Sequence, residues 1–118
     1  MQTLAYALVL LVAALHIAFL ILEMFMWHKP LGLKIFRLTP EYAATSKTLA
    51  ANQGLYNGFL AAGLIRGLLQ GNAGYDLQLF CLACVIAAGI YGAYSVSRNI
   101  FYVQALPAIL ALAALRFA

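Results

Sequence analysis

Four long apolar segments dominate this sequence and limit how it can fold. They cover residues 4–27, 40–70, 75–97 and 100–117, and a helix needs about 20 mostly apolar residues to cross a bilayer. Of the 118 residues, 66% are hydrophobic and 8% are charged, against about 45–50% apolar and 25% charged in an average soluble domain. We therefore predict an all-α membrane protein, a single domain of four transmembrane helices.

The positive charges predict how these helices are oriented. Most of them fall between or beside the predicted helices on one side of the membrane, at Lys29, Lys34, Arg37, Lys47 and Arg98. Only two arginines lie near the opposite helix ends, at positions 66 and 116. Because basic loops stay in the cytoplasm, we expect a multi-pass protein of the bacterial inner membrane with both termini outside the cytoplasm. The net charge of +4 is scattered, so a nucleic-acid partner is not expected.

Turn and cap signals set the predicted boundaries. Residues 28–39 contain Pro30 and Gly32 and are predicted to form a short basic loop. Thr39, Pro40 and Glu41 follow in the order typical of a helix start. Pro107 removes one backbone hydrogen bond from the last helix, so we expect a kink there.

Polar side chains inside the apolar segments are the candidate functional residues. A bilayer core offers no water to such groups, so they persist mainly where they meet a partner, a cavity or a ligand. The predicted topology places most of them at a similar depth in the cytoplasmic leaflet, and the predicted ligand-binding set is Asn52, Gln53, Tyr56, Tyr94, Arg98, Tyr102 and Gln104. The alternative is that these groups only hold helices together by hydrogen bonds.

Glu23 is the one carboxylate that lies beyond the first turn of a predicted helix, and with Arg98 and Tyr102 it is a candidate catalytic residue. We expect it to pair with Lys47 or Arg98, or to bind a ligand. Arg98 lies four residues after Tyr94 and four before Tyr102. A guanidinium between two phenols would suit a carboxylate, phosphate or oxyanion, whereas a lone Arg98 would anchor at lipid headgroups.

A row of small residues on the second predicted helix indicates close helix packing. Ala50, Gly54, Gly58 and Ala62 recur every fourth residue, which lets another backbone approach. We expect this row to support an oligomer.

Cys81 and Cys84 form a C-x-x-C pair within the third segment. Thiol redox chemistry is one interpretation, and simple packing of buried thiols is the other. No group of residues has metal-ligand spacing, so no metal site is predicted.

Several longer motifs carry a resemblance to a bacterial membrane family, domain of unknown function 1304. They extend over nearly the whole chain and read LEMFMW, LTPEYA, ANQGLYNGFLAAGL, GIYGA and VQALPAILAL. The resemblance implies the same membrane fold and no particular activity.

The chain also resembles, more distantly, the MAPEG superfamily of membrane-associated eicosanoid and glutathione enzymes. Asn52 is similar to the Asn that opens that superfamily's Asn-x-x-Glu motif, and Arg98 with Tyr102 is similar to its Arg-x-x-x-Tyr. The resemblance implies a trimer with a site between subunits, glutathione as cofactor, and transferase or isomerase activity. Leu55 stands where the motif has Glu, and Ala50 and Ala51 stand where it has basic residues.

Together these patterns predict a polar pocket near the cytoplasmic leaflet that binds a small lipophilic or anionic molecule. Whether a reaction follows stays open. The alternatives are a small oligomeric transporter or channel module, and a membrane thiol redox enzyme that uses Cys81 and Cys84. The expected partners are membrane lipids, the lipophilic ligand and further copies of the chain.

Overall fold

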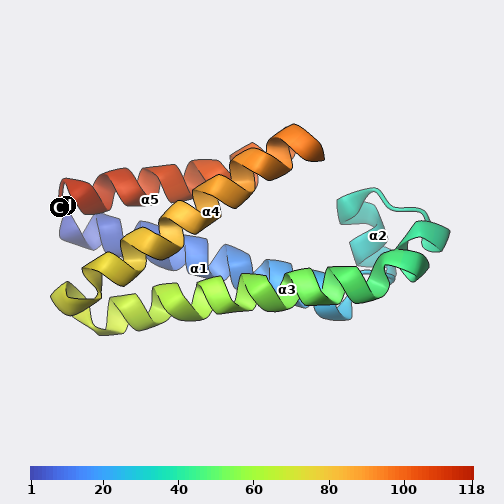
Figure 1. Cartoon of the computed structure of the whole chain (residues 1–118), viewed down its shortest axis with the longest axis horizontal. Helices are drawn as coiled ribbons and strands as arrows, with labels where there is room; N and C mark the ends of the chain where they lie inside the picture. Colours follow the sequence, from blue (N-terminus) through green and yellow to red (C-terminus); the bar gives the residue numbers. More distant parts are fainter. The chain divides into compact units, whose positions relative to one another are not determined.

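The computed structural model describes all residues from Met1 to Ala118 and is entirely helical (Figure 1). Its elements, in chain order, are α1 (Gln2–Phe25), α2 (Pro30–Phe36), α3 (Pro40–Leu69), the 3₁₀ turn η1 (Gly71–Gly74), α4 (Tyr75–Ser95), the π-helical turn η2 (Phe101–Ala105) and α5 (Leu106–Arg116). The sequence prediction of an all-α chain is confirmed. Two stretches, Gln2–Phe25 and Gly71–Ser95, are long and apolar enough to cross a membrane, judged by length and composition.

Contacts along the chain define two compact units. The first comprises Met1–Leu15 and Leu60–Ala118, and the second comprises His16–Phe59. Helices α1 and α3 each contribute one part to either unit.

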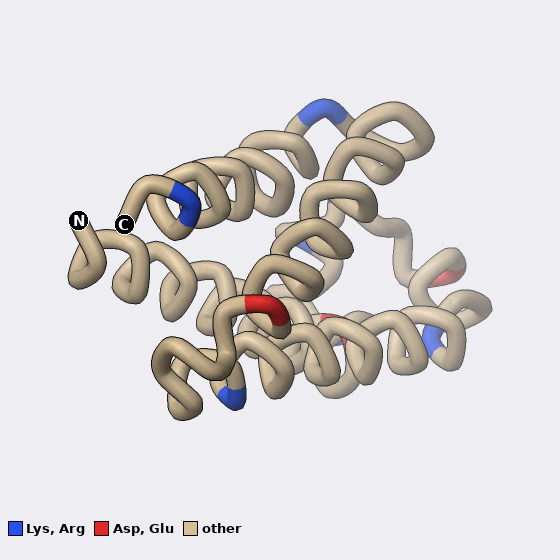
Figure 2. Tube along the Cα trace, turned by 60° about the vertical axis from the view of Figure 1, so that its left-hand side comes forward, with Lys and Arg blue, Asp and Glu red and all other residues tan.

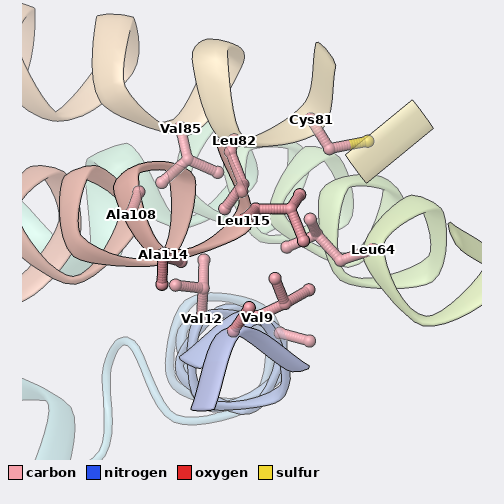
Figure 3. Packing of buried hydrophobic residues seen from close by; sticks show 12 residues of the cluster. Val9, Val12, Leu64, Cys81, Leu82, Val85, Ala108, Ala114 and Leu115 are labelled. Carbon is pink, nitrogen blue, oxygen red and sulfur yellow. The ribbon is translucent and has the colours of Figure 1, made fainter. Parts of the chain in front are cut away.

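The first unit is held together by a core of small and medium apolar side chains (Figure 3). Val9 and Val12 of α1 are buried together with Leu64 of α3, and Leu82 and Val85 of α4. Helix α5 presents its smallest residues to this core, at Ala108, Ala111 and Ala114. Small residues let helix backbones approach closely, so the helices are held together by van der Waals contact.

Two glycines of the first unit lie where backbones almost touch. A Cβ on Gly89 of α4 would lie 2.7 Å from the backbone nitrogen of Ala105 in η2. A Cβ on Gly74 would collide with the backbone of Gly67 in α3. The 3₁₀ turn η1 therefore packs directly against the end of α3, and α4 packs directly against the π-helical turn.

The second unit is built on a close approach of α1 and α3. A Cβ on Gly54 would lie 2.8 Å from Cγ of Met24 and 3.2 Å from the carbonyl oxygen of Leu20, and one on Gly58 would lie 2.5 Å from Cδ1 of Leu20. The expectation that this small-residue row joins separate subunits is thus wrong at Gly54 and Gly58. Both glycines serve packing inside one chain.

The basic segment 28–39 was predicted to be a loop, and this is also wrong. Residues Pro30–Phe36 form helix α2, with Pro30 in the first turn and Arg37 at the end in the left-handed conformation (φ 55°). Proline suits that position because its missing N–H would have no partner there. Gly32 is needed because a Cβ there would collide with the carbonyl of Met26.

The structure has a π-helical turn just before Pro107, where the sequence predicted a kink. Phe101–Ala105 is π-helical, and the regular helix resumes at Leu106. Pro107 has no N–H to donate back to Val103, so the preceding turn can widen. The disturbed hydrogen bonding lies in the turn that contains Gln104.

Gly71 follows the end of α3 in the left-handed backbone conformation, which residues other than glycine adopt only at a cost in free energy. Its φ is 59° and a Cβ there would have nothing within 4 Å, so a substitution changes only the backbone preference. We expect Gly71→Ala to lower the free energy of unfolding by about 1–2 kcal/mol and Gly71→Asn to lower it less, because Asn tolerates this conformation. Unfolding in mixed micelles, followed by circular dichroism, measures both. Equal losses for the two variants would contradict this account.

Candidate functional site

The second unit contains a carboxylate that is paired with an amide between two apolar helices. Asn57 of α3 donates a hydrogen bond from Nδ2 to Oε1 of Glu23 on α1. Asn57 is buried and Glu23 is half-buried. The pair forms because the glycines at 54 and 58 bring the two helix backbones close enough for short side chains to meet.

The partner of Glu23 differs from the one expected. The sequence pointed to Lys47 or Arg98, whereas the structure gives Asn57. The single N–H of Asn57 occupies only one acceptor site of the Glu23 carboxyl group, so this group keeps acceptor capacity for a further donor. The signal that could have identified Asn57 is its spacing of four from Gln53, which marks a second polar row on α3.

An aromatic side chain fixes the chain just beyond this pair. Nε1 of Trp27 donates to Oγ of Ser46 at 3.0 Å, and that hydroxyl donates to the carbonyl of Tyr42 at 2.7 Å. The Trp27 ring also packs on Phe36 of α2, with 4.8 Å between ring centroids. These contacts tie α2 and the start of α3 to the end of α1.

Three of the predicted ligand-binding residues form an exposed row on the same part of α3. Asn52, Gln53 and Tyr56 are all exposed, and Tyr56 packs edge-on against Phe59 with 5.7 Å between centroids. They are not the residues that meet Glu23. The row is a polar surface of the single chain.

The other predicted site residues belong to the first unit. Tyr94 is 90% exposed near the end of α4, and Tyr102 is 65% exposed in η2. Arg98 is also exposed in the turn between them, whereas Gln104 is half-buried. The guanidinium of Arg98 and the phenols of Tyr94 and Tyr102 are thus all accessible in this unit.

Sequence reasoning missed one polar residue of the first unit. Gln78 of α4 is buried and donates from Nε2 to the carbonyl of Gly67 at 3.1 Å, while its Oε1 has no hydrogen-bond partner. It borders a small open cleft of about 290 Å³ that Tyr6 and Tyr75 also line. A Gln within an apolar segment was the available signal.

His16, which shares a face of α1 with Glu23 in the sequence pattern, is buried. Its ring lies edge-on to Phe19, with 5.1 Å between centroids.

The comparison with known proteins is informative over almost the whole length of the chain. The family described as "Protein of unknown function (DUF1304)" matches residues 10–116. The chain belongs to the DUF1304 family. A similar protein is the "Uncharacterized protein YpaA" of Lactococcus lactis subsp. lactis (strain IL1403), 32% identical over 114 residues, which cover 95% of this chain and 96% of YpaA. No solved structure matches the chain significantly.

The two cysteines of this DUF1304 chain lie in and beside the core of the first unit. Cys81 is buried in the same cluster as Leu82 and Val85 (Figure 3). Cys84 is half-buried. Both thiols are free. A buried thiol without a basic neighbour is not activated for redox exchange, so the environment favours the packing interpretation.

We expect the combined variant Cys81→Ala and Cys84→Ala of this DUF1304 chain to fold and to lose about 1–3 kcal/mol from the small cavities it leaves. Neither thiol of the wild-type protein should react readily with a membrane-impermeant maleimide, which mass spectrometry detects. The labelling is done on the protein in detergent micelles, where Ser97→Cys, at an exposed position, is the matched positive control. Rapid labelling at Cys81 or Cys84 would instead support the thiol redox alternative.

Proposed function

We propose that this DUF1304 protein is a four-span protein of the bacterial inner membrane that binds the polar head of a small lipophilic molecule. The observation that carries the proposal is the Glu23–Asn57 hydrogen bond between apolar helices. Carboxylates inside membranes are costly and mark sites of function by default. Figure 2 shows how few charges the chain has, with long stretches of tube that carry neither sign.

Helix α3 is part of the proposed bundle although its composition is more polar. Its 30 residues would extend about 45 Å at 1.5 Å per residue, which exceeds the hydrocarbon thickness of a bilayer. The turn η2 together with α5 reaches from Phe101 to Arg116 and is a shorter, mostly apolar helical stretch. With α1 and α4 these stretches supply four spans, with both termini outside the cytoplasm.

Asn52, Gln53 and Tyr56 form an exposed row on α3. This row favours an assembly in which α3 has a neighbour other than lipid. An amide without a partner in an apolar medium costs about 2–7 kcal/mol, so these groups require a neighbouring copy or a ligand. A homo-oligomer satisfies this need, and the likeness to the MAPEG superfamily suggests a trimer with sites between subunits.

The chemistry of each polar group, taken within its own unit, suggests its role. Asn52, Gln53, Tyr56 and Gln104 would orient the polar head by hydrogen bonds. Arg98, between the phenols of Tyr94 and Tyr102, would neutralise an anionic group. Glu23 would act as acid, base or electrostatic partner where a reaction follows.

Glutathione does not fit the residues present. Leu55, which is 42% exposed, occupies the position of the acidic residue in the superfamily's motif, and Ala50 and Ala51 replace its basic residues. The tripeptide's charges would meet apolar side chains there. The proposal therefore names a lipophilic ligand with one polar head and no thiol cofactor.

The test is to identify what the purified protein retains. Native mass spectrometry of the wild-type oligomer should show a bound small molecule in addition to bulk phospholipid. The variant Asn52→Leu with Gln53→Leu should retain at least ten-fold less of it, because two hydrogen bonds at about 1 kcal/mol each are lost. Asn72→Leu, which removes an exposed amide from η1, is the matched control and should retain it fully.

Two outcomes would contradict the proposal. One is a purified protein that carries only bulk lipid under conditions that preserve the oligomer. The other is a cation flux through reconstituted vesicles that depends on Glu23 while no molecule is retained, which would favour the transporter or channel alternative.

A further inference from the structure

Helix α2 has an exposed apolar face that nothing in the second unit covers. Leu31 is 46% exposed and Ile35 is 49% exposed. Because they are four residues apart, they lie on the same side of the helix. The neighbouring side, about 100° around the helix, holds buried Gly32 and half-buried Phe36, which packs on Trp27.

Basic residues surround this face. Lys29, Lys34 and Arg37 are all exposed, and Glu41 is the one acidic residue between positions 28 and 45. An apolar strip flanked by cations is complementary to the anionic surface of a bilayer, where headgroup phosphates lie above acyl chains. The position along the chain agrees, because α2 follows shortly after α1, a helix able to cross the membrane.

We propose that α2 is an interfacial anchor that binds anionic phospholipid. Leu31 and Ile35 enter the boundary between headgroups and acyl chains, and Lys29, Lys34 and Arg37 hold the phosphates. The contacts of Trp27 with Phe36 and with Ser46 hold α2 at a fixed place beside the end of α1. This assignment does not depend on the ligand site of the proposed function.

The chain offers its own reporter for this contact. Trp27 is the sole tryptophan, and its ring lies against α2. Bromine atoms on lipid chains quench tryptophan fluorescence only at close range. The full chain is reconstituted in bilayers in which either the phosphatidylglycerol or the phosphatidylcholine carries bromine, at equal mole fractions of the two lipids. Brominated phosphatidylglycerol should quench Trp27 several-fold more effectively per mole than brominated phosphatidylcholine.

A charge variant and a matched control separate specific binding from a general effect of charge. Lys29→Gln with Lys34→Gln should remove most of the preference, since each basic residue near an anionic surface contributes up to about five-fold. Arg66→Gln with Arg116→Gln removes the same charge from the ends of α3 and α5 and should leave the preference unchanged. Equal quenching by both lipids in the wild type, or a preference that survives the first variant, would overturn the proposal.

The apolar face is tested separately. Leu31→Ser with Ile35→Ser should reduce quenching by both brominated lipids, because α2 then leaves the acyl boundary, while circular dichroism should show a folded chain. A Trp27 that neither lipid quenches in the wild type would mean that a second copy covers the face, and this too would overturn the proposal.

Discussion

Asn57→Leu is expected to lower the free energy of unfolding by about 2–3 kcal/mol, although leucine is more apolar than asparagine. The substitution leaves the half-buried Glu23 carboxylate without its donor, and a hydrogen bond to a charged group contributes about 1.5–3 kcal/mol. Unfolding in mixed micelles followed by circular dichroism measures the loss.

The chain supplies a close control for this substitution. Asn52→Leu makes the same chemical change five positions earlier on the same helix, at an exposed site. In detergent it should change stability by less than about 0.5 kcal/mol. The variant Glu23→Leu with Asn57→Leu should recover part of the loss, because no charge is then left without a partner. Similar losses for Asn52→Leu and Asn57→Leu would rule out a special role for the pair.

Gly54→Leu is expected to have a larger effect, about 3 kcal/mol or more. Its side chain would enter the space held by Met24, Glu23 and the Leu20 carbonyl. Overpacking alone costs about 1–3 kcal/mol, and separating α1 from α3 also breaks the hydrogen bond between Glu23 and Asn57. The same unfolding measurement detects it, as does weaker protection of the α1 amides against hydrogen exchange.

Ala62→Leu is the matched comparison, because Ala62 continues the same row of small residues but is exposed. It should leave the stability of the single chain nearly unchanged. If Ala62→Leu were as damaging as Gly54→Leu, the contact of this row with α1 would not explain the effect.

The sequence predicted the helical class and the beginning of α3 because these depend on composition and local caps. Thr39 accepts a hydrogen bond from the backbone of Tyr42 through its hydroxyl, as the capping pattern indicated. Helix α2 was missed because Pro30 and Gly32 were interpreted as breakers. Pro30 instead begins the helix, and Gly32 fits a close backbone contact that only the folded chain reveals.

Of the candidate site, too, only part could be predicted from the sequence. The sequence identified Glu23 as the important carboxylate, since a charge inside an apolar segment is visible without a structure. It could not identify Asn57 as the partner, because that depends on how closely α1 and α3 approach at Gly54 and Gly58. A periodic row of small residues indicates close packing but does not say which helix occupies it.

The π-helical turn lets the last helix tolerate a change of chain length. Such a turn bonds residue i to residue i+5 and so holds one residue more than an α-helical turn, and its five residues rotate the backbone about as far as four α-helical residues at about 100° each. Deleting one of the five residues Phe101–Ala105 should therefore restore regular helix and leave the alanines of α5 facing their core. Among relatives, single-residue insertions and deletions should be tolerated at this turn. The turn absorbs one residue without changing the angular register of the C-terminal helix.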